Sequence, residues 1–448
     1  MHFLFSAANK RNRFLAMVVV GALALVSLPA GADRINVKTL KKGITKEIVR
    51  GRMDRHPDKS VVGLPSLGQA LPLAADAAAP PIPATIVSPF IEPSSRSNSM
   101  NYGFLVGNSP FATTGVGISS IKTFVAPIVI TVHQVATDFG VDADGNLILT
   151  GITNQDATFD PTQPSPACLG KTNNVPFTLA VQSPNFTNLP YVWGGTNLGT
   201  TQYGDAFQRA NYWKASAEVP HQYHMRLSPV EVLPPVVLDF PVGTGIALPQ
   251  SSTFAGYSNC APTVLVDFAY FDALLDYQNI PNLASSGVNS GNFPIFVGGN
   301  VLWGQVIGEL PIFNAQAAGY HSFSSVDPAQ TYAVMQFGDE NFFTWPDAVV
   351  LSHEIGEWMN DPTGSNETTA YTISLPGSAP YCQSNYEVGD ALAGTFMPPI
   401  KGSNGYTYTV QELAFFSYFY GGPSFGVNGW YSSNDTFKTD AGAVCSPF

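Results

Sequence analysis

Apolar and polar positions alternate over short runs in residues 101–250, and Gly, Pro, Asn and Asp separate these runs. KTFVAPIVITVHQV is rich in β-branched residues, and GVDADGNLILTGI places Asp-Gly between two apolar runs. β-Branched residues favour strands, and Asp-Gly in this position favours a hairpin. TQYGDAFQRANYW interrupts the pattern with helical spacing, because Asp205 and Arg209 lie one turn apart. The pattern predicts a mainly β region.

Residues 251–448 carry a mixed pattern. TVLVDFAYFDALLDYQ fits a strand or a helix, whereas FPIFVGGNVLW and TYAVMQF fit strands. Past Pro362 the chain becomes rich in aromatic residues and loops. We therefore expect an α+β protein, with a mainly β N-terminal region followed by a second, mixed region.

A helix is predicted at about residues 345–360, within TWPDAVVLSHEIGEWMNDP. Thr344 can cap its start, Pro346 fits the first turn, and Asp347 lies three residues after the cap. Asp361 precedes a proline, and a residue in that position avoids helical backbone. The helix should therefore end there.

The N-terminal residues 1–32 combine basic residues, an apolar run and a small-residue ending, Ala-Gly-Ala. This pattern is typical of a secretory signal peptide cut after Ala32, with an uncleaved anchor as the alternative. No later apolar run reaches the length of a membrane span. Residues 33–100 are charged and then rich in Ala, Pro and Ser, which predicts a largely disordered leader or pro-segment, or a simple linker. We expect a secreted protein, extracellular or periplasmic.

The net charge of −12 argues against a nucleic-acid partner, since binding phosphates needs a basic surface. The four cysteines form no C-x-x-C pair, which argues against a thiolate zinc site. An even number of cysteines in an exported chain favours two disulfides. Proximity along the chain favours Cys168–Cys260 and Cys382–Cys445.

The predicted helix carries a candidate metal site. His353 and Glu357 are four residues apart, so they share a face and can reach one ion. Glu354 is rotated by about 100° from His353, where a general base beside a metal-bound water belongs. Asp361 lies about 12 Å further along the helix, so a capping or supporting role is expected. An ordinary amphipathic helix with three polar residues is the alternative.

A third ligand is expected from the segment CQSNYEVGDAL, which offers Glu387 and Asp390. Glu387 is preferred as the ligand, and Asp390 as a carboxylate that supports a metal-bound histidine. One of the two should approach His353 or Glu357 to within about 5 Å, since ligands of one ion lie close together. One imidazole and two carboxylates can hold Zn²⁺, with manganese, iron and calcium as competitors. His321 is a candidate fourth ligand or oxyanion donor, or a structural histidine.

The stretch SHEIGEWMNDP followed by NYEVGDAL resembles the H-E-x-x-E-x-x-x-D-P and Y-E-V-x-D pair of bacterial secreted proteins with a zincin-like, metallopeptidase-type core. GYHS and TTQYGDAFQRANYW also resemble segments of such proteins, and S-H-E-x-x-E has a fainter similarity to the plant Exordium (phosphate-induced) family. The resemblance implies a zincin-like domain over residues 251–448.

The spacing of these residues leads us to expect an exported metallohydrolase, most simply a metallopeptidase that acts on a protein or peptide. His353, Glu357 and Glu387 would be its ligands, and Glu354 its general base. The alternative is a non-catalytic extracellular binding or cell-surface protein on a degenerate zincin scaffold. Aromatic, Gly- and Asn-rich loops such as FFSYFYGGPSFGVNGWYSSN favour this second hypothesis, because they suit contact with carbohydrate or protein.

Overall fold

The structure is a computed structural model that describes residues 87–93, 100–112, 117–141, 147–165, 174–216, 223–248, 253–254, 257–258, 261–307, 310–324, 330–338, 345–373, 380–442 and 445. The chain divides into two compact units, Met1–Arg55 and His56–Phe448, and all of these residues belong to the second. The predicted signal peptide and most of the leader lie outside the described residues.

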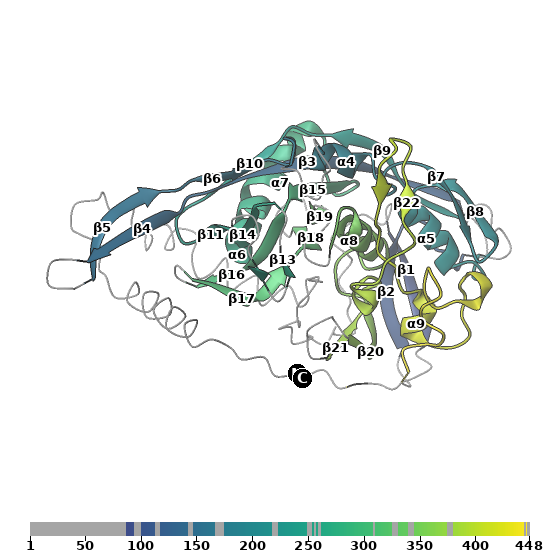
Figure 1. Cartoon of the computed structure of the whole chain (residues 1–448). Coiled ribbons are helices and arrows are strands. Elements are labelled where there is room, and N and C mark those ends of the chain that lie inside the picture. The colour runs from purple at the N-terminus through teal and green to yellow at the C-terminus, as the bar shows by residue number, and fades with distance from the viewer. Residues whose placement is uncertain are drawn as a thin grey trace. The chain divides into compact units, whose positions relative to one another are not determined.

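A mixed sheet forms the centre of the second unit (Figure 1). In the described chain it contains seven strands, in the order β10 (Val236–Phe240), β3 (Ile118–Val132), β15 (Phe293–Gly299), β19 (Gln330–Phe337) and β18 (Gly319–Ser324), with β6 (Ala157–Phe159) and β9 (His224–Val232) also paired to β3. Most neighbours are parallel, whereas β6 and β18 are antiparallel to their partners. Because β3 pairs with β15, one sheet joins the two regions predicted from the sequence pattern.

The remaining strands form a smaller sheet and several hairpins. The smaller sheet has the order β11 (Gly245–Leu248), β14 (Thr263–Asp267), β16 (Val301–Ile307) and β17 (Leu310–Ala317). The two-stranded pairs are β1 (Val87–Pro93) with β2 (Met100–Val106), β4 (Val135–Val141) with β5 (Leu147–Asn154), β7 (Leu189–Trp193) with β8 (Thr196–Thr201), β12 (Thr253–Phe254) with β13 (Tyr257–Ser258), β20 (Glu367–Ile373) with β21 (Tyr381–Asn385), and β22 (Ile400–Lys401) with β23 (Thr407–Tyr408). The predicted Asp-Gly hairpin is confirmed as β4 and β5.

Helices are fewer than strands in the described chain. They are α4 (Pro176–Val181), α5 (Tyr203–Asn211), α6 (Phe268–Leu274), α7 (Ile280–Asn282), α8 (Val349–Asn360) and α9 (Phe416–Tyr420), with short helical turns η1 (Leu275–Asn279), η2 (Leu283–Ser286), η3 (Asp390–Leu392) and η4 (Val427–Gly429). The α+β class is confirmed, and the ambiguous run after residue 261 contains both a strand, β14, and a helix, α6.

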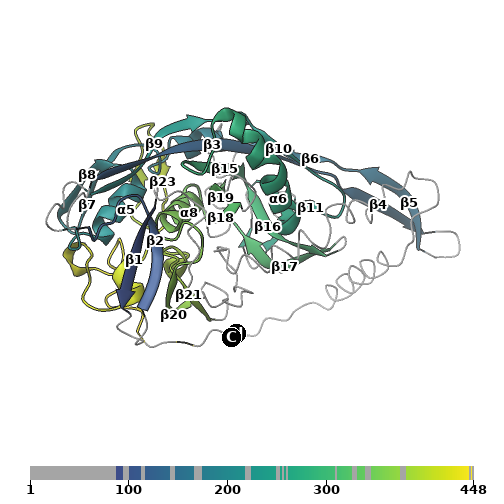
Figure 2. The ribbon, with the colours of Figure 1, turned by 180° about the vertical axis from the view of Figure 1, so that it is seen from behind.

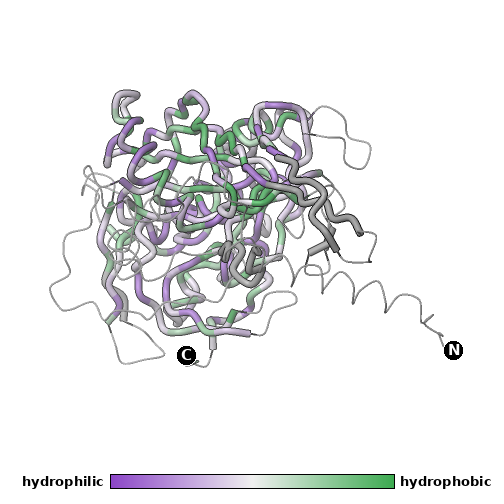
Figure 3. The backbone as a smooth tube through the Cα atoms, turned by 90° about the vertical axis from the view of Figure 1, so that its left-hand side faces the viewer, coloured by the Kyte–Doolittle hydropathy of each residue, from purple (hydrophilic) through white to green (hydrophobic). Residues whose placement is uncertain are grey.

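The central sheet separates two hydrophobic cores. Along β3, Ile121 and Val125 belong to the core that contains α8, whereas Phe124, Ala126 and Ile128 belong to the core that contains α6. This alternation follows from the strand geometry, in which successive side chains point to opposite faces. Figures 1 and 2 show α8 and α6 at different places along the sheet, and Figure 3 shows hydrophobic stretches running through the interior of this unit.

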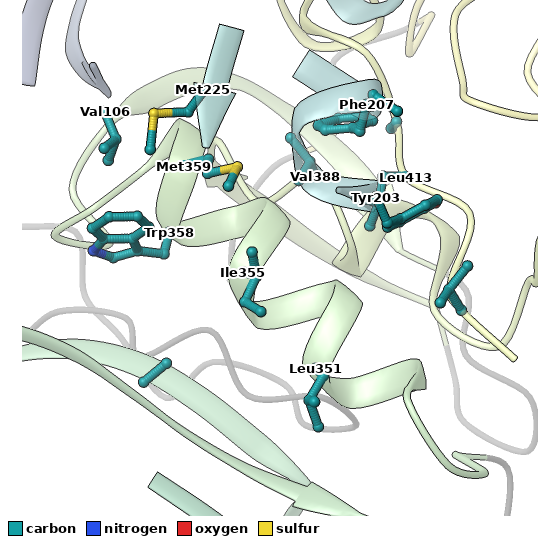
Figure 4. Close-up of a cluster of buried hydrophobic side chains, with 14 of the residues drawn as sticks. Val106, Tyr203, Phe207, Met225, Leu351, Ile355, Trp358, Met359, Val388 and Leu413 are labelled. Atoms are coloured by element: carbon teal, nitrogen blue, oxygen red, sulfur yellow. The ribbon is translucent and has the colours of Figure 1, made fainter. Parts of the chain in front are cut away.

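Helix α8 is buried along its whole length. Leu351, Ile355, Trp358 and Met359 belong to this core, and Met359 lies close to side chains of β2, β9 and α5 (Figure 4). The Trp358 ring stacks on Phe293 of β15 with centroids 3.6 Å apart. Burial of each large apolar side chain stabilises the fold by about 1.5–3 kcal/mol. These contacts fix the rotation of α8, and they therefore fix where its polar face points.

The predicted start of this helix is wrong by four residues, since α8 begins at Val349 rather than at about residue 345. Asp347 has a positive φ of 37° and forms a β-bridge with Gly338. Its carboxylate accepts hydrogen bonds from the backbone N–H of Ala348 and of Thr409. Asp347 therefore anchors the chain ahead of the helix, and tertiary partners replace the capping pattern. Thr344 lies outside the described residues.

The predicted leader also extends too far. Val87–Pro93 forms β1, which pairs antiparallel with β2. Phe90 is buried, and its ring lies 5.4 Å from that of Phe416 and 5.6 Å from that of Tyr420. A composition rich in Ala and Pro predicts disorder only where no partner is present, and here the aromatic C-terminal region supplies one.

The disulfide Cys382–Cys445 ties β21 to the C-terminal segment, which confirms one predicted pairing. Cys168 and Cys260 lie outside the described residues. None of the helices in the described ranges is both long enough and apolar enough to cross a membrane.

Candidate metal centre

The polar face of α8 carries three fully buried side chains, His353, Glu354 and Glu357. The predicted shared face is confirmed, because His353 Nε2 lies 3.0 Å from Glu357 Oε1. The alternative of a solvent-facing amphipathic helix is excluded by this burial. Charged groups held inside a protein need partners, since an isolated buried charge is costly.

The segment after β21 brings two more acids to this face. Asp390 Oδ1, at the start of η3, lies 3.4 Å from His353 Nε2, which confirms the predicted approach. Its other oxygen accepts a hydrogen bond from Gln383 Nε2 at 2.9 Å. Glu387 accepts from Asn385 Nδ2 at 3.0 Å, and its Oε2 lies 3.9 Å from His321 Nε2. The structure thus places Asp390 beside His353 Nε2, whereas the sequence favoured Glu387 as the third ligand and Asp390 as support for a histidine.

The backbone around Gly389 closes tightly on α8. The N–H groups of Gly389 and Asp390 both donate to Glu357 Oε1 at 3.1 Å. A β-carbon at position 389 would overlap the His353 imidazole, so only glycine permits this approach. The glycine of the E-V-G-D stretch was visible in the sequence, but nothing there indicated which ring it faces.

Gln411 fixes the orientation of the His353 ring. Its Nε2 donates to the Gly389 carbonyl at 2.5 Å, so its Oε1 accepts from His353 Nδ1 at 3.0 Å. His353 Nδ1 therefore carries a proton, and in the neutral imidazole the Nε2 lone pair faces Glu357 and Asp390. Histidines that bind metals have this arrangement, with the far nitrogen donating to an oxygen. Sequence reasoning missed Gln411, because VQEL carries no pattern of its own.

His321 approaches the same acids from β18. Its Nε2 donates to the Asp361 carbonyl at 2.8 Å. Its Nδ1 lies 3.4 Å from Glu354 Oε2 and 3.7 Å from Glu357 Oε2. The Asp361 carboxylate accepts from the backbone N–H of Ser365 and Asn366, so it closes the loop after the helix. Asp361 therefore supports the site by orienting His321 through its backbone.

Two groups of donor atoms result, and each lies within 4.8 Å. The first contains His353, Glu357 and Asp390, and the second contains His321, Glu354 and Glu357. Buried nitrogen and carboxylate donors of this kind could hold a metal ion, and they suit zinc, manganese or iron.

Three polar atoms of the cluster have no hydrogen-bond partner among the described residues: His353 Nε2, Glu354 Oε1 and Glu387 Oε2. An unsatisfied buried polar atom costs about 1–3 kcal/mol, and more if it is charged. Three such atoms in one cluster are expected where a further group, such as a cation, binds.

The protonation of the cluster reflects its burial and its crowding. Burial raises the pKa of Glu354 to about 7. Burial, and then the charge of Glu357, raise the pKa values of Glu387 and Asp390. Burial alone would lower the pKa of His353, but Glu357 and Asp390 outweigh it and raise this pKa well above its usual value. Protons must therefore balance the charge wherever a cation does not.

The other histidines have simpler surroundings. His224 donates to the buried Asp205, and His221, three residues earlier, lies outside the described residues. His133 lies just after β3 and forms ion pairs with Asp156 and Asp239, all three at least one-third exposed. We therefore assign them no metal role.

A cavity of about 410 Å³ lies away from the cluster and is lined in part by Trp193 and Trp430. Comparison of the chain with protein-family models, curated proteins and solved structures gave no match. The geometry of the cluster is therefore the basis for assigning a function.

Proposed function

We propose that the protein is an exported metal-dependent hydrolase of the metallopeptidase type, with a zincin-like domain around α8. His353, Glu357 and Asp390 would hold Zn²⁺ or another divalent cation. The observation that carries this proposal is the locked His353 ring. Its far nitrogen is held by Gln411, and its Nε2 faces two buried carboxylates at 3.0 and 3.4 Å.

A bound cation would supply Lewis acidity for a substrate carbonyl and would make water more acidic. Glu354 follows His353 on the helix, and its Oε1 has no hydrogen-bond partner among the described residues. With a pKa raised by burial to about 7, its carboxylate can accept a proton from the attacking water near neutral pH. It then returns that proton to the leaving amine. His321 lies beside Glu354, with its Nδ1 3.4 Å from Glu354 Oε2.

The charge of the cluster favours a neutral acyl group over an anionic substrate. Glu354, Glu357, Glu387 and Asp390 carry up to four negative charges, and one divalent cation balances two of them. The remaining negative charge disfavours phosphate esters and tolerates an amide or ester carbonyl. Among such substrates, the resemblance of S-H-E-I-G-E to the H-E-x-x-E motif favours a protein or peptide.

The experiment is metal analysis combined with a protein-cleavage assay on purified wild type and two variants. His353→Ala should lose both the cation and the activity. Glu354→Gln should keep the cation at His353 and lose at least a hundredfold in kcat, since general-base catalysis contributes about 10²–10⁴. His224→Gln, a buried histidine outside the cluster, is the control for metal content. A wild type that retains no stoichiometric metal after loading with any divalent ion would overturn the proposal.

The burial of the cluster favours a second candidate, a non-catalytic extracellular binding protein. His353, Glu354 and Glu357 are all 0% exposed, whereas the cavity lined by Trp193 and Trp430 lies elsewhere. A cation in so closed a site would stabilise the fold, and the aromatic cavity would bind the partner. Cleavage that disappears in Glu354→Gln while the cation stays would decide against this candidate. Metal-loaded protein that cleaves no substrate would favour it.

A further inference from the structure

His321 repeats the arrangement of His353 on the opposite side of Glu357. Its Nε2 donates to a carbonyl, that of Asp361, at 2.8 Å. This bond places the proton of the neutral imidazole on Nε2, so the Nδ1 lone pair is directed toward the carboxylates. Nδ1 lies 3.4 Å from Glu354 Oε2 and 3.7 Å from Glu357 Oε2. Two histidines from different elements, β18 and α8, thus present a nitrogen to the same acidic cluster.

Glu357 lies between them and faces each with a different oxygen. Its Oε1 is 3.0 Å from His353 Nε2, and its Oε2 is 3.7 Å from His321 Nδ1. Glu357 belongs to both donor groups, and no group found among the described residues contains both histidines within 4.8 Å. One ion cannot therefore bind both rings as they stand, because ligands of one ion approach to about 2.0–2.2 Å of it.

We propose that the cluster is a two-cation centre, in which Glu357 bridges the ion at His353 and a second divalent ion held by His321 and Glu354. This inference rests on the proposed function for its first cation and adds the second. Carboxylate-bridged pairs of divalent ions lie about 3.5–4 Å apart in two-metal hydrolytic sites. The mixed nitrogen and oxygen donors suit Zn²⁺ or Mn²⁺.

The charge of the cluster supports the second ion independently of the tautomers. Glu354, Glu357, Glu387 and Asp390 are each at most 3% exposed. Among the described residues, no lysine or arginine forms an ion pair with Glu354, Glu387 or Asp390. When all four are ionised, one divalent cation balances two of the charges, and two divalent cations balance all four. Buried carboxylates that no cation balances must take up protons instead, so a second cation would allow all four to stay ionised.

The unpartnered atoms point to the same conclusion. Glu354 Oε1 and Glu387 Oε2 are buried and lack hydrogen-bond partners in the described structure. Neither residue belongs to the donor group of the first cation. With the second position filled, Glu354 binds through the oxygen that faces His321, and its Oε1 stays available for the proton of the attacking water. The second cation therefore gives the Glu354 carboxylate a cationic partner that the first does not.

The test is a metal count on the full protein, stripped with a chelator and reloaded with Mn²⁺ or Zn²⁺ alone. Wild type should bind two ions per chain, and His321→Ala should bind one with the affinity of the remaining site changed by less than about tenfold. Glu354→Gln should also fall to one. His133→Ala, which removes a histidine from the exposed Asp156–Asp239 pair, should keep two.

Electron paramagnetic resonance of the Mn²⁺-loaded wild type provides a readout that does not depend on how the variants fold. Two Mn²⁺ ions bridged by Glu357 should give a spin-coupled spectrum, and His321→Ala should give that of an isolated ion. One ion per wild-type chain with an uncoupled spectrum would overturn the second site and leave the proposed function standing. No bound ion at all would overturn both.

Discussion

The molecule buries a carboxylate beside a histidine in two places, and the two sites are built differently. At α5, Asp205 is 0% exposed, and both of its carboxylate oxygens accept hydrogen bonds from protein groups. Its Oδ2 accepts from Thr201 Oγ1 at 2.5 Å and from His224 Nδ1 at 2.7 Å, and its Oδ1 accepts from the Met225 N–H at 2.5 Å. Arg226 lies 3.8 Å away and balances its charge.

At α8 the acids outnumber the groups that could satisfy them. Glu354 Oε1 and Glu387 Oε2 have no hydrogen-bond partner in the described chain. Both sites are equally buried, so burial does not distinguish them. The difference lies in whether the protein supplies its own donors. A satisfied carboxylate such as Asp205 holds two elements together, whereas the α8 cluster is complete only when a ligand from outside joins it.

Removal of the satisfied carboxylate should have the largest effect on the stability of the protein. Asp205→Ala leaves the Met225 N–H and His224 without their acceptor and leaves Arg226 without its counter-charge. We expect the free energy of unfolding to fall by about 3–5 kcal/mol, as for other buried pairs that lose one member. Urea unfolding measures this change. Metal content per folded chain should not change, and a loss of stability below 1 kcal/mol would show that Asp205 is not structural.

Removal of the cation should have the next largest effect. A ligand that binds only the folded state stabilises it by about 3–4 kcal/mol when its concentration is 100–1,000 times its Kd. Chelation of wild type should therefore lower the free energy of unfolding by that amount, and readdition of metal should restore it. In His353→Ala the chelator should have a smaller effect, because only the ion proposed at His321 and Glu354 remains to be removed. A chelator effect of equal size in that variant would place the stabilising ion elsewhere.

The sequence predicted those side chains of the α8 site that a single helix brings together. His353, Glu354 and Glu357 lie together because residues one and four apart have fixed positions on any helix. The choice between Glu387 and Asp390 was not predictable, because it depends on how the Gly389 backbone packs on His353. Gln411 was missed because its role comes from a contact 58 residues away in the chain.

The fold shows the same division between local and distant causes. Strand runs such as β3 and β15 were predicted, because alternation and β-branched residues are local signals. The start of α8 and the strand β1 were predicted wrongly. Asp347 bonds to Thr409, and Phe90 packs against Phe416, so both depend on contacts with the C-terminal region. No periodicity in a single sequence identifies such partners.

The pH dependence of stability should separate the metal-free from the metal-loaded protein. Burial raises the pKa of Glu354 and of Asp361 to about 7, and neighbouring carboxylates raise that of His353 against the effect of burial. The folded metal-free protein therefore binds more protons than the unfolded chain from about pH 4.5 to 7. Stability falls as pH rises in that case. We expect a loss on the order of 2 kcal/mol between pH 5 and pH 7.5, since one pKa unit is worth about 1.4 kcal/mol.

Thermal unfolding at several pH values, with and without chelator, measures this slope. The metal-loaded protein should show a weaker or opposite slope, because a cation displaces protons from its ligands. A metal-free protein that is more stable at pH 7.5 than at pH 5 would contradict the raised pKa values.

The smallest effect is expected when a carboxylate is replaced by its amide. We compare this substitution at Glu387, which is surrounded by other acids, and at Glu412, which is satisfied by hydrogen bonds. In metal-free protein at pH 8, Glu387→Gln removes one of several mutually repelling charges, and we expect it to stabilise the fold by about 1 kcal/mol. Burial and the charge of Glu357 raise the pKa of Glu387, so a lower pH favours its protonated form and the effect should shrink toward pH 5. Glu412 is the matched control, since it is equally buried but accepts hydrogen bonds from Ser432, Asn434 and Thr436. Glu412→Gln should destabilise the protein by about 1.5–3 kcal/mol at both pH values, because it removes bonds to a charged acceptor. If Glu387→Gln were as destabilising as Glu412→Gln, the α8 cluster would be satisfied by its own protein groups, and the difference between the two kinds of site would disappear.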